Sequence, residues 1–161
     1  MISIEVYSDF KFQMKTITMY LFGSWAWFIF SMILLIMLFC YPFTRSIQST
    51  RRLVKNCAEW IMRLTRLDLV VEGEENLIDG SSILVANHAS YTDPMVLAAA
   101  LPADFAFVAK KELKYIPFAG YVLGKIGTHL VDRKDPRKGA DDFNKIMKSS
   151  KENDSIIFSL V

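Results

Sequence analysis

The sequence predicts an α/β domain preceded by a hairpin of two helices. A long uncharged run near the N-terminus, followed by a basic amphipathic segment, predicts the hairpin. A regular alternation of strand-like and helix-like segments in the rest of the chain predicts the α/β domain. The 161 residues are enough for one modest domain. We therefore expect membrane-anchoring helices in residues 1–66 and an α/β domain in residues 67–161.

The uncharged run extends from Thr16 to Thr44. It is long enough to cross a bilayer, because a spanning helix needs roughly 20 apolar residues. A cleaved signal peptide would have a shorter apolar core and a small-residue cleavage pattern, so we expect the run to stay in the membrane. More basic residues lie just after the run than before it, which predicts that its C-terminal side faces the cytoplasm. A re-entrant segment that enters only one leaflet is the alternative.

Residues 46–66 have apolar side chains at helical spacing, with arginine and lysine on the rest of the circumference. This pattern is typical of a basic amphipathic helix. Such a helix could lie on an anionic membrane surface beside the first helix. The alternative is a helix that packs against the protein core and has a solvated basic face.

From residue 67 the pattern alternates between short β-rich runs and helical segments. The predicted strands are residues 67–71, 83–86, 105–109, 128–131 and 155–158. The predicted helices are residues 94–101, 117–126 and 136–150. This order favours a sheet with parallel strand pairs, in which ligands bind at the carboxyl ends of the strands.

One such strand end carries the segment Asn87-His88-Ala89-Ser90-Tyr91-Thr92-Asp93. A plain helix would turn His88 and Asp93 to different faces, so a loop must bring them together. We expect Asp93 to be the N-cap of the next helix and Pro94 its first residue. An ionised Asp93 would hold one ring nitrogen of His88 and leave the other to accept a proton from a hydroxyl group. The alternative is a helix cap beside a structural histidine.

Arg133 follows the strand 128–131 in the same way. Between residues 110 and 138 there are eight basic residues against three acidic ones, so this part of the domain offers a positive field. A ligand that carries a phosphate would suit Arg133. The alternative is a solvated turn formed by Asp132 and Arg133.

Other chemistries are disfavoured. A metal site of a phosphohydrolase, built from His88, Asp93, His129 and Asp132, would need His129 and Asp132 on one face, but the strand pattern turns them to opposite faces. The net charge of only +2 argues against a nucleic-acid partner. The two cysteines have neither zinc nor disulfide spacing.

The ordered motifs resemble those of the glycerolipid acyltransferases, the family of bacterial 1-acyl-sn-glycerol-3-phosphate acyltransferases. Asn87-His88 and Asp93 match the family's His-x4-Asp motif, and Gly127 to Arg133 match its second motif, which ends in an Asp-Arg pair. Ala109-Lys110-Lys111-Glu112-Leu113 and Ile116-Pro117-Phe118-Ala119-Gly120 are similar to the stretch between these motifs. The resemblance covers roughly residues 69–158.

The resemblance implies transfer of a fatty acyl group from acyl-CoA or acyl carrier protein to the free hydroxyl of a lysophospholipid, first of all 1-acyl-sn-glycerol-3-phosphate. His88 would be the general base and Asp93 its orienting partner. Arg133 would bind the phosphate of the acceptor, and Lys110 and Lys111 would bind donor or acceptor phosphates. The implied enzyme uses no cofactor or metal and works on membrane lipids at the cytoplasmic face of a bacterial inner membrane.

At one point the chain departs from the family pattern. The family continues after the strand 155–158 with Pro-Glu-Gly-Thr-Arg, which helps to bind the acceptor phosphate, whereas this chain has Ser159-Leu160-Val161. We therefore expect a C-terminally incomplete acyltransferase domain. Two outcomes stay open: an active acyltransferase, or an inactive acyltransferase-like membrane protein that binds lipid or acyl-CoA.

Overall fold

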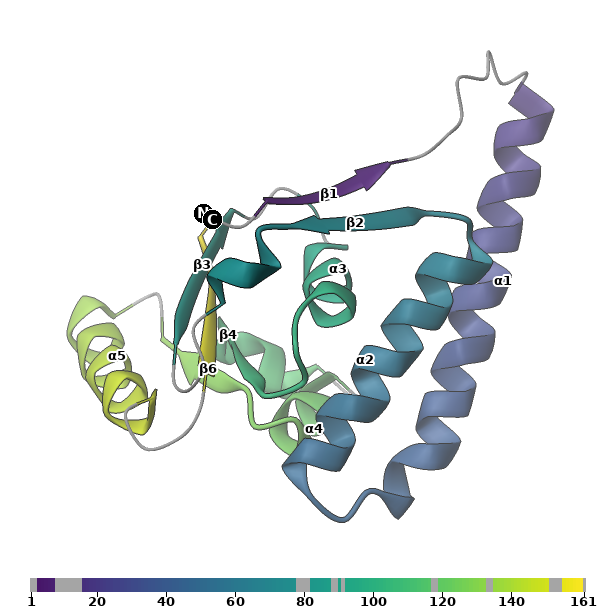
Figure 1. Cartoon of the computed structure of the whole chain (residues 1–161). Helices are drawn as coiled ribbons and strands as arrows, with labels where there is room; N and C mark the ends of the chain where they lie inside the picture. Colours follow the sequence, from purple (N-terminus) through teal and green to yellow (C-terminus); the bar gives the residue numbers. More distant parts are fainter. Residues whose placement is uncertain are drawn as a thin grey trace.

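The computed structural model describes residues 3–7, 16–77, 82–87, 90, 92–116, 119–132, 135–150 and 155–160. Its helices are α1 (Thr16–Cys40), α2 (Ile47–Leu64), α3 (Asp93–Ala100), α4 (Ala119–Lys125) and α5 (Pro136–Ser150). Its strands are β1 (Ser3–Tyr7), β2 (Asp68–Glu72), β3 (Ile83–Asn87), β4 (Phe105–Lys110), β5 (His129–Val131) and β6 (Ser155–Leu160). Three short 3-10 helices are η1 (Tyr41–Phe43), η2 (Glu74–Asn76) and η3 (Lys111–Tyr115). Figure 1 shows the hairpin of α1 and α2 on one side of the molecule, with the α/β part beside it.

The main sheet has four parallel strands in the order β3-β6-β4-β5. Its register pairs Asn87 with Leu160 and Lys110 with Val131. The carboxyl ends of these strands therefore meet at one edge of the sheet. The α/β class is confirmed, and the strands and helices predicted for residues 67–161 occur within one or two residues of their expected bounds. Residues 117–118, the start of one predicted helix, lie outside the described residues.

A second, two-stranded sheet was not predicted. Strand β1 pairs antiparallel with β2, in a register that runs from Ser3 opposite Glu72 to Tyr7 opposite Asp68. Strand β1 belongs to residues 1–66 and β2 to residues 67–161. The two predicted parts of the chain therefore share a sheet.

Helix α1 packs through one narrow stripe. Ile29, Ile33 and Met37 follow one another at four-residue spacing and are buried against Cys57 and Ile61 of α2. The rest of the circumference is apolar and exposed, and includes Ile17, Leu21, Trp27, Phe28, Leu35 and Phe39. The span Ile17–Phe43 has the length and hydropathy of a membrane-crossing helix, yet only 22% of its most apolar window is buried within the protein.

Helix α2 lies between α1 and α3. On the face next to the α1 contact, Ala58 and Met62 are buried together with Ala99 of α3. Ser46 begins the helix with a capping box, since its hydroxyl accepts a hydrogen bond from the N–H of Ser49 while its own N–H donates to the hydroxyl of Ser49.

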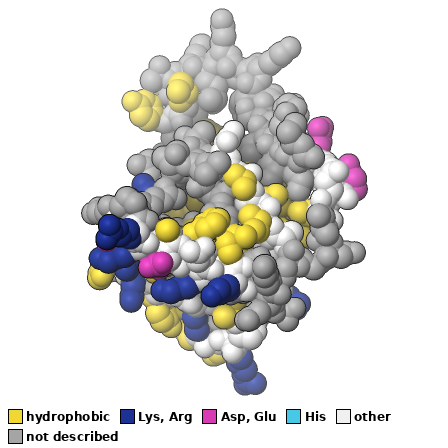
Figure 2. All heavy atoms as spheres, turned by 90° about the vertical axis from the view of Figure 1, so that its left-hand side faces the viewer, with side chains coloured by type: hydrophobic (Ala, Val, Ile, Leu, Met, Phe, Trp, Pro, Cys, Tyr) yellow, Lys and Arg dark blue, Asp and Glu magenta, His cyan; other side chains and the backbone are white. Residues whose placement is uncertain are grey.

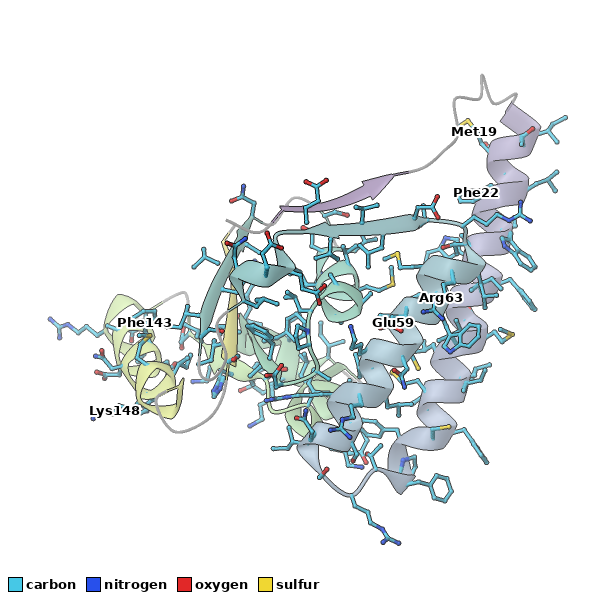
Figure 3. The ribbon with its side chains drawn as sticks, viewed as in Figure 1. Met19, Phe22, Glu59, Arg63, Phe143 and Lys148 are labelled. Carbon is cyan, nitrogen blue, oxygen red and sulfur yellow. The ribbon has the colours of Figure 1, made fainter. Side chains whose placement is uncertain are left out.

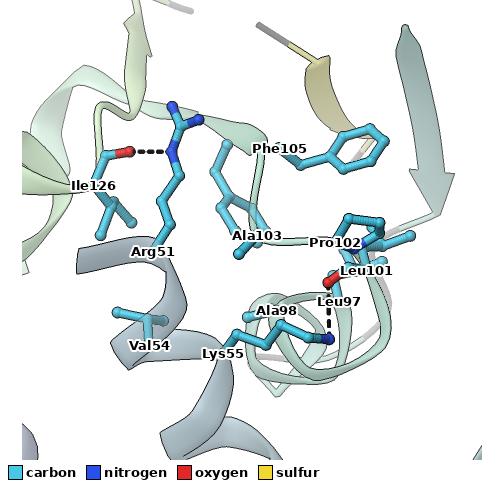
Figure 4. Close-up of a pocket in the computed structure, with 11 residues that line it drawn as sticks. Arg51, Val54, Lys55, Leu97, Ala98, Leu101, Pro102, Ala103, Phe105 and Ile126 are labelled. Carbon is cyan, nitrogen blue, oxygen red and sulfur yellow. Dashed lines mark hydrogen bonds between the residues drawn. The ribbon is translucent and has the colours of Figure 1, made fainter. Parts of the chain in front are cut away.

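Two cations of α2 point into the protein (Figure 4). Arg51 is only 8% exposed, and it donates from Nε to the carbonyl of Ile126 and from Nη1 to that of Asp104, each at 2.8 Å. Lys55 donates from Nζ to the carbonyls of Ala99 and Leu101 at 2.7 and 3.0 Å. The prediction of a membrane-surface helix was wrong for these side chains, because main-chain carbonyls of the α/β domain bind them. The face of α2 that carries Arg51 and Lys55 is therefore turned toward the core, as the alternative expected, while Arg52, Arg63 and Arg66 are exposed.

The core of the α/β domain lies where α3 meets the sheet. Leu97, Ala100, Leu101 and Phe105 are buried there. Partly buried side chains of the neighbouring strands and of the segment after β2 pack against them, namely Leu69, Val71, Leu77, Leu84, Ala86 and Phe107. This packing fixes α3, which begins at Asp93, against the strands.

Candidate active site

The loop between β3 and α3 carries the predicted acid–base pair. Strand β3 ends at Asn87, and α3 starts at Asp93 with Thr92 as the N-cap residue. The prediction of Asp93 as N-cap was therefore wrong by one position. The reason is local, since Thr92 already has near-helical torsions and the N–H of Asp93 donates to the carbonyl of Ser90 at 3.1 Å. Asp93 is thus the first residue of the helix.

The carboxylate of Asp93 is anchored within this turn. Its Oδ2 accepts a hydrogen bond from the N–H of Ser90 at 2.8 Å. The hydroxyl groups of Ser90 and Thr92 are 2.9 Å apart, and the N–H of Thr92 donates to Oγ of Ser90 at 3.2 Å. These contacts fix the orientation of the carboxylate, as an orienting partner of a general base requires. His88 lies outside the described residues, so its pairing with Asp93 stays a prediction.

Lys110 and Lys111 lie at the same edge of the sheet. Lys110 is the last residue of β4, beside Val131 of β5, and its side chain is exposed. Lys111 begins η3, and its Nζ is 4.0 Å from Oδ2 of Asp132. Strand β6 separates β4 from β3, so Lys110 and Asn87 are two strand spacings apart, about 10 Å. A ligand of lipid headgroup size could reach both.

The described residues on either side of Arg133 are anchored by hydrogen bonds. The N–H of Asp132 donates to Oδ2 of Asp142 at 3.3 Å, and the N–H of Asp135 donates to Oδ1 of Asp132 at 3.4 Å. A Cβ at Gly139 would lie 2.8 Å from the carbonyl oxygen of Asp132, so a glycine is needed for the close approach of α5 to the end of β5. Arg133 itself lies outside the described residues, and its contact with an anion stays a prediction.

Asp135 precedes α5 and binds its first turn. Its Oδ1 accepts hydrogen bonds from the N–H groups of Arg137 and Lys138 at 3.1 and 3.4 Å. The next residue, Pro136, occupies the first helical position. Sequence reasoning predicted this helix but missed the anchoring roles of Asp132, Asp135 and Asp142. The Asp-Pro pair at 135–136 was the available signal.

The metal alternative finds no support in the described ranges. They contain no group of three or more histidine, cysteine, aspartate or glutamate side chains that could hold a metal ion. Asp132, one member of the set considered, instead accepts from Asp135 and lies next to Lys111.

The surface near the sheet combines apolar and cationic groups. Ile83 and Val85 of β3 are 41% and 58% exposed, so this face of the strand is largely open. Figure 2 shows apolar side chains gathered across the middle of this side of the molecule, with lysine and arginine side chains beside them. Such a surface suits a ligand with both an apolar chain and an anionic group.

The helical hairpin and the parallel sheet define an α/β protein with polar side chains at the carboxyl edge of its sheet. A family model described as Acyltransferase matches residues 68–159, which is more than half of the chain. The chain belongs to this acyltransferase family. The matched residues contain every site residue predicted from the sequence.

Individual relatives agree with this assignment. Proteins named 1-acyl-sn-glycerol-3-phosphate acyltransferase are 38% identical over 98 residues in Saccharomyces cerevisiae, 41% over 58 in Helicobacter pylori and 29% over 105 in Borreliella burgdorferi. These alignments cover 60%, 36% and 65% of this chain, but only 32%, 24% and 42% of the three relatives. The chain therefore matches less than half of the length of each of them.

A solved structure shares the fold. The crystal structure of the 1-acyl-sn-glycerophosphate (LPA) acyltransferase PlsC from Thermotoga maritima superposes with a TM-score of 0.65 at 22% identity. The match covers 91% of this chain and 61% of that protein. It therefore includes the N-terminal helices as well as the α/β domain.

Proposed function

We propose that this chain transfers a fatty acyl group from a thioester donor to the free hydroxyl of 1-acyl-sn-glycerol-3-phosphate, giving phosphatidate. The donor would be acyl-CoA or acyl carrier protein. The observation that carries the proposal is the family match across residues 68–159, which contains the His-x4-Asp loop at the carboxyl edge of a parallel sheet. The names of the three relatives supply the substrate.

The proposed chemistry needs one base and its orienting partner. His88 accepts the proton of the acceptor hydroxyl while the hydroxyl oxygen attacks the thioester carbonyl carbon. A C–O bond forms and the C–S bond breaks. His88 returns the proton to the leaving thiolate, which departs as the free thiol. Asp93, anchored through Ser90, holds the second ring nitrogen and stabilises the imidazolium. No covalent acyl-enzyme is required.

The residues proposed to bind anions follow strands β4 and β5 in the sequence or end them. Arg133 binds the acceptor phosphate, and Lys110 and Lys111 bind donor or acceptor phosphates. Lys111 is well placed to exchange its partner, because its 4.0 Å pair with Asp132 is long and half of its side chain is exposed. The exposed Lys110 has its charge available at the same edge.

We further propose that α1 lies roughly parallel to the membrane plane, within the cytoplasmic leaflet. Its exposed apolar side chains suit the boundary between headgroups and acyl chains. Since α1 packs along α2 from Ile29 to Met37, a perpendicular α1 would carry the exposed Arg52 and Arg63 into hydrocarbon. Each charge would cost roughly 2.5–3.5 kcal/mol there. A shallow α1 avoids this cost and brings the α/β domain to a lipid acceptor.

A thioester-release assay tests the proposed reaction. The purified full chain, in vesicles, is given acyl-CoA or acyl carrier protein with and without lysophosphatidate, and free thiol is measured. We expect release that depends on lysophosphatidate and is lost in His88→Ala. His129→Gln is the matched control, because it changes the other histidine of the chain. Binding of lysophosphatidate or acyl-CoA without any turnover by the intact chain would favour the inactive lipid-binding protein instead.

A further inference from the structure

A cleft lies between α1 and the C-terminal end of α2, on the side of α2 away from the candidate active site. It is open to solvent, has a volume of about 410 Å³ and is lined by Phe22, Trp25, Arg63, Leu64, Thr65 and Arg66. Figure 3 shows Phe22 on α1 and Arg63 with Glu59 on α2. Two arginines and two aromatic residues thus line one cleft.

The two arginines lie on either side of the residue at which α2 ends, Leu64. The N–H of Arg66 donates to the carbonyl of Arg63 at 3.2 Å, and Arg66 has a left-handed backbone with φ of 55°. Arg63 is 68% exposed and lies 3.8 Å from Oε2 of Glu59, and its Cζ is 5.8 Å from the ring centroid of Trp60. An exposed ion pair of this length contributes little, so Arg63 can turn to a stronger anionic partner.

The end of a helix normally repels anions, because its last carbonyls carry partial negative charge. Here hydrogen bonds engage several of those carbonyls. Nε1 of Trp25 donates to the carbonyl of Leu64 at 3.2 Å, which also ties α1 to α2. The hydroxyl of buried Thr65 donates to the carbonyl of Ile61 at 2.6 Å, and the N–H of Leu67 donates to that of Met62 at 3.0 Å. These carbonyls therefore have partners within the protein, and Arg63 and Arg66 are the charged residues among those that line the cleft.

Apolar side chains continue from the cleft along α1. The rings of Trp25 and Phe28 stack at 6.1 Å between centroids, and they are 49% and 59% exposed. Leu21 and Tyr20, one turn earlier, are also exposed. An arginine pair beside exposed aromatic and aliphatic groups matches a phosphate headgroup with its attached acyl chains.

We propose that this cleft binds the phosphate of an anionic phospholipid of the surrounding bilayer. Arg63 and Arg66 hold the phosphate, and Trp25, Phe28 and Leu21 contact the acyl chains. The bound lipid sets the depth and rotation of the hairpin at the membrane. This proposal rests on the proposed membrane contact of α1 and is independent of the proposed acyl transfer.

Co-sedimentation of the full chain with vesicles tests the cleft. Vesicles of phosphatidylcholine alone are compared with vesicles that also contain phosphatidylglycerol. We expect tighter binding to the second kind, and a loss of this preference in the double variant Arg63→Gln and Arg66→Gln, about fivefold for each arginine. The matched control is Arg45→Gln with Arg52→Gln, two exposed arginines away from the cleft, which should keep the preference.

Several results would overturn the proposal. An equal loss in both double variants would show a diffuse attraction without a site. If added inorganic phosphate, at matched ionic strength, abolished the preference for phosphatidylglycerol, the cleft would be a site for free phosphate. Equal binding of the unaltered chain to both kinds of vesicle would refute the binding of an anionic phospholipid in the cleft. The proposed membrane contact of α1 would still stand. No binding to either kind would refute that membrane contact, while acyl transfer in detergent would still test the proposed reaction separately.

Discussion

Lys55 of α2 donates a hydrogen bond from Nζ to the carbonyl oxygen of Ala99 in α3, at 2.7 Å. Ala99 lies in the last turn of α3, and Asp93 is its first residue. A cation at a helix C-terminus is favourable, and this one also satisfies a carbonyl that has no partner within the helix. The N-terminal hairpin thus helps to hold the helix that carries the proposed orienting carboxylate.

Replacing Lys55 by methionine should lower the stability of the chain. The methionine keeps most of the apolar stem but leaves the carbonyls of Ala99 and Leu101 without their donor. We expect the free energy of unfolding to fall by about 1.5–3 kcal/mol, the range for hydrogen bonds to charged groups. Denaturant unfolding in detergent measures the change. Lys148→Met, an exposed position on α5, should leave stability nearly unchanged.

Asp93→Asn should separate folding from catalysis. The amide oxygen of asparagine can still accept the hydrogen bond from Ser90, so the turn should persist. The negative charge that would stabilise an imidazolium is lost, and we expect kcat to fall by about 10²–10⁴-fold with little change in KM. Steady-state kinetics measure both constants. Asp141→Asn, an exposed change on α5, should retain full activity, and equal losses in the two variants would contradict the assigned role.

Two glycines of α4 should respond differently to alanine. A Cβ at Gly120 would collide with the main-chain carbonyl of Lys114 in η3, whereas a Cβ at Gly124 would meet nothing within 4 Å. We expect Gly120→Ala to lower the free energy of unfolding by about 1–3 kcal/mol. Gly124→Ala should be neutral or stabilising, because alanine is the better helix former. Thermal unfolding of the two variants side by side provides the comparison.

Cys57 should be an unreactive thiol in the folded chain. It is buried between α1 and α2, and this burial raises the pKa of the thiol above its ordinary value. At pH 8 the thiolate fraction of Cys57 is therefore smaller in the folded chain than in the unfolded chain, and burial also blocks the access of a reagent. In a Cys40→Ala background, alkylation by iodoacetamide should be at least tenfold slower before denaturation than after it. Equal rates would show that the α1–α2 packing is loose.

Hydrophobic periodicity was enough to predict the helices and the parallel sheet. The strand ending at Asn87 and the helix following Pro136 are both local patterns, and both occur as expected. Strand β1 was missed, because five residues form a strand only through pairing with β2, which lies more than 60 positions away. Long-range pairing of this kind leaves a weak local signal.

The candidate site was predictable in its composition but less so in its contacts. The order His88, Asp93, Lys110, Lys111, Arg133 follows from motifs at strand ends. The anchoring of Asp93 by Ser90 and the inward direction of Arg51 and Lys55 depend on tertiary structure. A basic side chain in an amphipathic helix is usually solvated, so its use as a donor to distant carbonyls could not be read from spacing.

Formation of phosphatidate from radiolabelled lysophosphatidate tests the central claim most directly. The intact chain and His88→Ala are incubated with the same thioester donor, after both are shown to unfold at the same temperature. We expect labelled phosphatidate from the intact chain and at least a hundredfold less from His88→Ala. Equal product from both, or none from the intact chain with either donor, would contradict the account.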